Sequence, residues 1–144
     1  MDYSRRDLGF LLSALTVTAA STNAAAMSAV LPSKTYQYDD LPVTANGPNR
    51  ARAILKGETH AGFPIELHET ELAPGEQPHP PHHHLHEEMV LVREGALEVT
   101  ISGRSANLGA GSVAYVASNE EHGWRNVGNG RARYFVFALG RDDA

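Results

Sequence analysis

Short apolar runs separated by turn residues make up most of the chain from residue 33 onward. The runs are rich in Val, Ile, Thr, Tyr and Phe, which favour strands, and clusters of Gly, Pro or Asn lie between them. Residues 97–101 alternate apolar and polar positions at a period of two, as a half-buried strand does. The expected strands are residues 50–56, 65–73, 88–93, 97–102, 113–117, 122–127 and 133–139.

The same pattern indicates the fold class. Beyond residue 33 no apolar run is long and periodic enough to predict a helix. Many short strands at this spacing are typical of an all-β sandwich or barrel. The length of 144 residues favours a single domain, which we place at residues 33–144.

The first 26 residues have a different character. Arg5 and Arg6 precede an uncharged, mostly apolar stretch over residues 8–20, and three alanines end at Ala26. This order predicts a helical export signal over residues 1–26, cleaved near Ala26. The paired arginines resemble a twin-arginine signal, which exports folded proteins, so we expect a periplasmic protein. A retained membrane anchor is the alternative, but the apolar run is shorter than the ~20 residues that span a bilayer.

Composition limits the partners and the chemistry. Seventeen acidic and 12 basic residues give a net charge of -5, and no basic cluster favours binding to nucleic acid or anionic lipid. The chain has no cysteine, so a metal site has to use nitrogen and oxygen ligands. Five of the eight histidines lie between residues 79 and 86.

This histidine cluster is a candidate metal site. On a strand, His82 and His84 would point to one side and His83 to the other. Glu88 has the same parity and adds a carboxylate, and His122 is the only histidine later in the chain. The alternatives are a histidine-rich tract that binds metals loosely and a solvated polar loop.

Two motifs in this region resemble those of the cupin family. Residues 75–95 contain Gly75, then His82-x-His84-x3-Glu88, then Gly95, and this stretch resembles the first cupin motif. Residues 111–126 read Gly111-x10-His122-x3-Asn126, which resembles the second motif. The short separation of the motifs resembles the compact bacterial members. Ala117 and Asn119 depart from the second motif, which has Pro and Gly at these positions.

The resemblance implies a jelly-roll barrel, also called a double-stranded β-helix, with one divalent metal ion in its mouth. Carried over to this chain, the ligands are His82, His84, Glu88 and His122, and two octahedral positions remain open. Gly95, Gly111 and Asn126 become turn positions. The remaining histidines of the cluster have no ligand counterpart, and we expect them to be solvated or to orient a ligand; they are His79, His83 and His86.

Two further residues are candidates for the substrate pocket. Trp124 follows His122 by two positions and would share its face, where it could stack on a substrate; an ordinary core position is the alternative. His68 shares a strand face with Glu66 and could reach the cavity, or could be a buried histidine satisfied by its neighbour.

We therefore expect an exported metal-binding cupin that acts on a small molecule as a dioxygenase-type oxidoreductase. A metal-dependent lyase or isomerase and a non-catalytic binding protein for a sugar-like ligand are the alternatives. Iron(II) or manganese(II) is favoured, with zinc(II) as a rival. Residues 88–93 are apolar on both faces in their middle, which predicts a homodimer. No nucleic acid partner and no stable membrane insertion after cleavage are expected.

Overall fold

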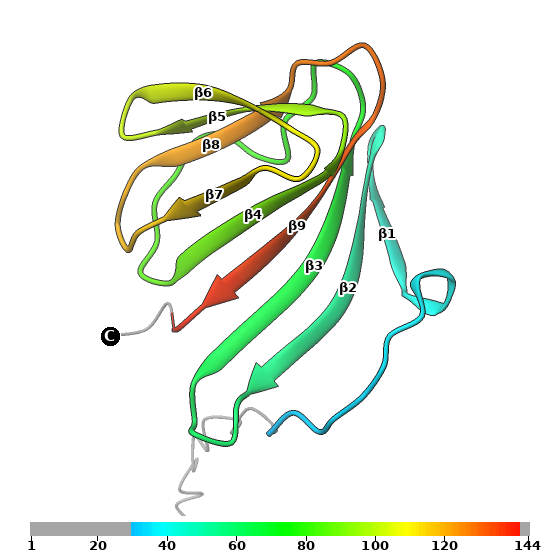
Figure 1. The fold of residues 1–144 in the computed structure, drawn as a ribbon, viewed down its shortest axis with the longest axis vertical. Helices are drawn as coiled ribbons and strands as arrows, with labels where there is room; N and C mark the ends of the chain where they lie inside the picture. The colour runs from blue at the N-terminus through cyan, green and yellow to red at the C-terminus, as the bar shows by residue number, and fades with distance from the viewer. Residues whose placement is uncertain (1–29, 142–144) are drawn as a thin grey trace, which may run out of the picture.

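Nine strands form two facing sheets within residues 30–141, which are the residues that this computed structural model describes (Figure 1). The larger sheet has the order β1-β2-β3-β9-β4-β7, the smaller has the order β6-β5-β8, and the paired strands are antiparallel. This arrangement is a jelly roll, so the expected all-β class is confirmed. The elements are η1 (a 3-10 helix, Tyr38–Asp40), β1 (Val43–Asn46), β2 (Asn49–Glu58), β3 (Pro64–Leu72), β4 (Glu87–Glu94), β5 (Ala96–Ile101), β6 (Arg104–Gly109), β7 (Val113–Val116), β8 (His122–Asn126) and β9 (Ala132–Leu139).

The seven strands expected from the sequence are all present, and their ends lie within two residues of the expected ones. The sequence pattern did not predict β1 and β6. Every residue of β1 is exposed, and β6 has a single partly buried residue, Leu108. Both are edge strands without a buried face, so they lack the apolar alternation that reveals a strand. The expected export signal over residues 1–26 lies outside the described residues.

The core lies between the two sheets. Alternate residues of β4, β5 and β9 point inward, and Trp124 of β8 joins them. The indole Nε1–H of Trp124 donates a hydrogen bond of 2.8 Å to the Tyr134 hydroxyl. Burial raises the pKa of Tyr134 well above its usual value, so the phenol stays protonated. The cluster consists of Leu72, Val90, Val92, Leu97, Val99, Trp124, Ala132, Tyr134 and Val136.

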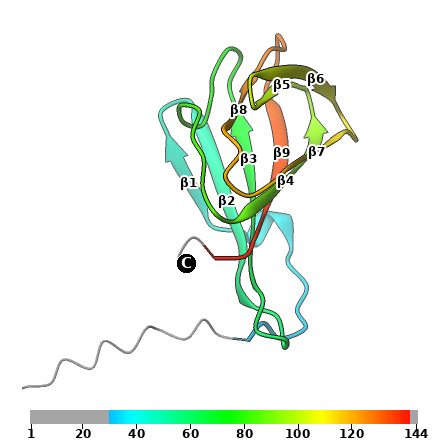
Figure 2. The same ribbon diagram turned by 90° about the vertical axis from the view of Figure 1, so that its left-hand side faces the viewer.

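The smaller sheet covers only one end of the larger sheet. In two views at right angles, β5, β6 and β8 lie over the upper part, and the lower ends of β2 and β3 extend beyond them (Figures 1 and 2). Inward-facing residues at these lower ends therefore lie outside the sealed core, at the mouth of the barrel. Among the described residues, no helix is long and apolar enough to cross a membrane.

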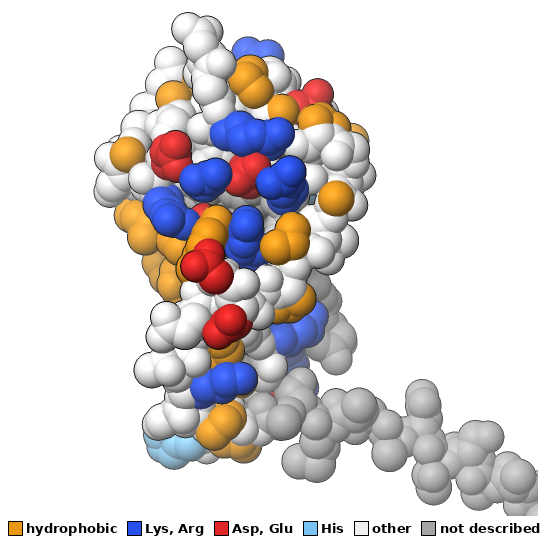
Figure 3. Space-filling model, turned by 90° about the vertical axis from the view of Figure 1, so that its right-hand side faces the viewer, with side chains coloured by type: hydrophobic (Ala, Val, Ile, Leu, Met, Phe, Trp, Pro, Cys, Tyr) orange, Lys and Arg blue, Asp and Glu red, His pale blue; other side chains and the backbone are white. Residues whose placement is uncertain are grey.

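The outer face of the larger sheet carries buried charge. Glu69 and Glu71 are 1% and 2% exposed, although their register places them on the outer side of β3. Arg93 pairs with Glu69 at 2.7 Å and Arg133 with Glu71 at 2.8 Å. Figure 3 shows basic side chains gathered around acidic ones on one side of the molecule. Burial raises the pKa of Glu71, but Arg133, Arg131 and Arg50 together outweigh burial and bring this pKa below its usual value.

Asn126 joins the end of β8 to the larger sheet. Its side chain is fully buried, and its Nδ2 donates to the carbonyl oxygens of Leu72 at 3.0 Å and Gly130 at 2.8 Å. Its Oδ1 accepts from the backbone N–H of Gly128 at 2.9 Å. One amide therefore satisfies three backbone groups from two segments, the end of β3 and the β8–β9 loop, which explains why this position holds asparagine.

Gly95 is a turn glycine that no other residue can replace without strain. It links β4 to β5 with a φ of +81°, and an added Cβ would lie 2.8 Å from both the Cα of Ala132 and the carbonyl oxygen of Arg131. We expect Gly95→Ala to lower the free energy of unfolding by about 3 kcal/mol, through combined backbone strain and steric overlap. Urea unfolding followed by circular dichroism measures the change.

Gly103→Ala is the matched control. Gly103 has a similar φ of +77°, but nothing lies within 4 Å of its added Cβ. Backbone strain alone should cost about 1 kcal/mol. Equal losses for the two variants would show that the close approach of β9 to Gly95 does not matter.

Candidate metal centre

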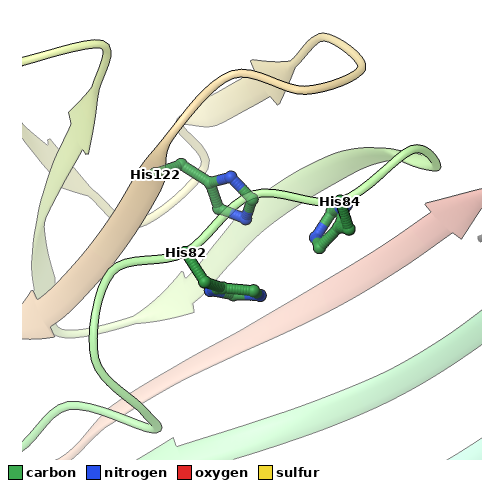
Figure 4. A group of neighbouring side chains, drawn as sticks. All are labelled: His82, His84 and His122. Carbon is green, nitrogen blue, oxygen red and sulfur yellow. The ribbon is translucent and has the colours of Figure 1, made fainter.

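Three imidazole rings converge at one end of β8 (Figure 4). His122 is the first residue of β8, and His82 forms an isolated bridge with it. The backbone N–H of each of these two residues donates to the carbonyl oxygen of the other, at 3.0 and 2.9 Å. His84 follows, and one ring nitrogen from each of the three histidines lies within 4.8 Å of the others. His83 is exposed, as the parity argument expected, although residues 82–84 form no regular strand.

Backbone carbonyls fix the tautomers of two of these histidines. The Nδ1 of His84 lies 2.8 Å from the carbonyl oxygen of His86, and the Nδ1 of His122 lies 2.8 Å from that of Glu120. A carbonyl oxygen can only accept, so each Nδ1 carries the proton and donates it. The Nε2 lone pairs of both rings are therefore left for another partner, which is the arrangement found behind metal-binding histidines.

Glu88 of β4 closes the group from a third side. Its side chain is almost buried, with Oε1 3.5 Å from His84 Nε2 and Oε2 3.3 Å from His122 Nε2. The expected ligands His82, His84, Glu88 and His122 thus come together in the structure.

Unsatisfied polar atoms provide the test of whether a cation fits this group. Five buried side-chain nitrogen or oxygen atoms among residues 30–141 have no hydrogen-bond partner, and four of them belong to this cluster. Leaving such atoms unpaired costs about 1–3 kcal/mol each, and a cation would satisfy all four at once. Three nitrogens and one carboxylate oxygen are donors that divalent iron, manganese and zinc accept. The four atoms are His82 Nδ1, His84 Nε2, Glu88 Oε2 and His122 Nε2.

The electrostatic environment favours the neutral form of His82. Burial lowers its pKa most, and the nearby histidines His79, His122 and His84 lower it further, while Glu88 opposes them. A histidine has to be neutral to bind a metal. His82 therefore remains able to act as a ligand at a lower pH than an exposed histidine.

His86 lies closer to the ligands than the sequence suggested. Its ring stacks on that of His84 with the centroids 3.5 Å apart, and its Nε2 is 3.3 Å from Glu88 Oε1. His84, His86 and Glu88 form a second group that could hold a cation. His79 also contacts the cluster, because its ring meets the ring of His82 edge-on at 4.2 Å. His79 and His86 therefore both lie beside the expected metal ligands.

Asn119 explains one departure from the second motif. It adopts a φ of +62°, a left-handed conformation that glycine adopts freely and asparagine tolerates better than most residues. Its backbone N–H donates to the carbonyl oxygen of His84 at 2.8 Å. The loop before His122 therefore keeps the backbone turn that the motif's glycine would form. Its hydrogen bond joins this loop to the segment that carries His84.

The two candidate pocket residues lie in different environments. Trp124 is 5% exposed, stacks on His122 with centroids 5.5 Å apart, and belongs to the core cluster. His68 is 30% exposed, and its Nδ1 lies 3.4 Å from Glu66 Oε1. Cross-strand neighbours share a sheet face, and the inward-facing Val136 and Val90 stand opposite His68 in register. His68 therefore points into the barrel from β3, across β9 from the ligands.

Comparisons with known proteins agree with this geometry. Residues 68–138 match the model of the cupin domain family. No curated protein is similar enough to this sequence to count as a match.

Solved structures share the fold at low sequence identity. KdgF from a Halomonas species matches with a TM-score of 0.65 and 17% identity, over 78% of this chain and 98% of its own. An RmlC-like cupin from Shewanella frigidimarina gives 0.63 and 17%, over 78% and 95%. The polyketide cyclase RemF from Streptomyces resistomycificus gives 0.61 and 21%, over 78% and 83%. At these identities the likeness shows the fold alone.

Removing one imidazole tests the ligand set. We expect His122→Ala to weaken zinc(II) binding by at least about 100-fold, more than the loss usually seen for residues that only orient a ligand. Isothermal titration calorimetry of the metal-free protein measures the dissociation constant. His83→Ala is the control, because His83 is exposed and lies outside both candidate cation groups. Unchanged affinity in His122→Ala would contradict the assignment.

Proposed function

We propose that this chain is a cupin, as the match of residues 68–138 to the cupin domain family indicates, that it binds one divalent metal ion there, and that it acts on a small molecule as a dioxygenase-type enzyme. The proposed ligands are His82, His84, Glu88 and His122. The observation that supports the site is that four buried atoms without hydrogen-bond partners belong to one cluster. An iron or manganese ion held there would supply Lewis-acid and redox chemistry, and it would do so for a small molecule and dioxygen.

The surrounding residues support a stable and dry site. The carbonyl oxygens of His86 and Glu120 hold two imidazoles in the tautomer that offers Nε2. Trp124 and Tyr134 close the inner end of the barrel behind His122, since both are buried and hydrogen-bonded to each other. These residues would keep water from entering the site from the core side, so that a small molecule would approach from the mouth.

Export and metal choice are linked in this proposal. The support for export is the sequence of residues 1–26, with its paired arginines and small-residue end. A protein exported already folded would take its metal in the cytoplasm, which favours iron(II) or manganese(II) over the more tightly bound zinc(II).

Metal analysis and N-terminal sequencing of protein isolated from the periplasm test both points. An intact N-terminus would exclude the cleaved signal, and zinc as the bound metal would exclude this route of metal choice.

The dioxygenase reading predicts metal-dependent oxygen uptake. With iron(II)-loaded protein and a panel of small phenols and catechols, an oxygen electrode should record consumption equal to the substrate lost. His122→Ala should abolish the uptake and His83→Ala should leave it unchanged. Product formation without oxygen uptake would replace this reading by a lyase or isomerase. Binding without any turnover would replace it by a non-catalytic ligand-binding protein.

The lyase or isomerase reading has one observation in its favour. Reactions of this type need a base beside the polarised substrate. The pair formed by His68 and Glu66 lies on the inner face of the sheet that carries Glu88. It offers an imidazole that is not part of either candidate cation group.

We also propose that two copies of the chain pair through the outer face of the larger sheet. One apolar row crosses four strands of this face, and Tyr115 at its end is 56% exposed. The row consists of Leu67, Phe137, Met89 and Tyr115. Tyr115→Asp should convert a dimer into a monomer in equilibrium sedimentation at micromolar concentration. Val127→Asp, at another exposed apolar position, should remain dimeric. A monomeric unmodified protein would contradict the proposal.

A further inference from the structure

A second polar group lies on the inner sheet face that carries Glu88, two strands away from it. In the register of the larger sheet, Glu66, Ala138 and Glu88 are in one row, and His68, Val136 and Val90 are in the next. Adjacent strands are 4.7–4.9 Å apart, so the backbones of Glu66 and Glu88 are about 10 Å apart. The strand between them presents only Ala138 and Val136 in these rows. The ionisable groups are therefore the two carboxylates and His68, together with Lys56 of β2, which stands opposite Glu66.

The contacts of Glu66 with Lys56 and His68 favour one orientation of the His68 ring. Lys56 Nζ lies 2.7 Å from Glu66 Oε2, and His68 Nδ1 lies 3.4 Å from Glu66 Oε1. Burial raises the pKa of Glu66, but Lys56 and His68 outweigh burial, and the carboxyl is ionised at neutral pH. An ionised carboxylate can only accept, so in the neutral form of the His68 ring an Nδ1–H would point toward it and the Nε2 lone pair would be available. The same carboxylate would stabilise the imidazolium after proton uptake.

A structural role does not account for this trio. Lys56 is 81% exposed, and the Glu66 and His68 side chains are each about one-third exposed. Ion pairs at such positions contribute roughly 0–1 kcal/mol to stability. The trio nevertheless lies on the inner face, where the side chains deeper in the barrel are apolar core residues. Polar groups placed at the open end of an apolar barrel are typical of a ligand site.

We propose that His68 takes the proton of a hydroxyl group on a small molecule bound between β3 and the metal ligands, and that Glu66 orients His68. The O–H bond of the molecule breaks, its electron pair stays on oxygen, and the proton moves to His68 Nε2. The spacing of about 10 Å between the two glutamate backbones suits a molecule the size of one phenol or catechol ring. This inference rests on the proposed function only for the place where the molecule binds.

The test is the binding of 4-nitrocatechol to the full chain loaded with zinc(II), which is not redox-active and so permits no oxidative turnover. Absorption titration measures the dissociation constant, and calorimetry in two buffers measures the protons released to solution. We expect His68→Gln to weaken binding at least about tenfold and to release more protons per molecule bound, because the proton has lost its acceptor. Glu66→Gln should weaken binding less, since His68 remains. His60→Gln is the control, because His60 is exposed in the β2–β3 turn.

The outcomes separate the inference from the proposed function. All variants should retain one zinc per chain, since His68 is not a proposed ligand. If the unmodified protein binds 4-nitrocatechol only when zinc is present and His68→Gln matches it in affinity and proton release, the role of His68 is wrong and the metal centre stands. If zinc causes no binding of 4-nitrocatechol to the unmodified protein, the open metal positions are wrong, and the inference fails with them.

Discussion

The reciprocal backbone hydrogen bonds between His82 and His122 are the constraint on which the rest of the site depends. Their segments are 40 residues apart, and this pair places one ligand directly opposite another at the edge of β8. The hydrogen bond from Asn119 to the carbonyl oxygen of His84 ties the same two segments together a second time. The positions of the three imidazoles are therefore set by backbone geometry, and their side chains need little further ordering to receive an ion.

This arrangement has an energetic consequence for the metal-free protein. Four polar atoms without partners are held in a buried cluster, and each of them opposes folding until an ion binds. Burial of apolar side chains in the packed core around Tyr134 offsets this cost. Binding of an ion would then stabilise the folded chain by mass action, which couples metal content to resistance against unfolding.

The sequence predicted those features that depend on local pattern. Strands with one buried face were visible in the alternation of their residues, and motif spacing indicated four side chains that the structure brings together. The same reasoning missed β1 and β6, because exposed edge strands carry no such alternation. The sequence pattern also did not predict that the His86 ring stacks on the His84 ring. This contact depends on the turn before β4, and alternation along a strand says nothing about residues in a turn. The placement of Glu66 in one row with Glu88, and of His68 in the next row, required the register of β3, β9 and β4.

The two halves of the mouth are therefore built from different parts of the fold. Backbone contacts between the segment before β4 and the smaller sheet fix His82, His84 and His122, whereas His68 and Glu66 depend only on the position of β3 in the larger sheet. Side chains on β3 could therefore change without moving the imidazoles, so the proposed ligand set could be combined with different residues on β3. Ala138 sets the limit of this freedom. It stands between Glu66 and Glu88, and a larger side chain there would fill the space in which a bound molecule would contact both groups.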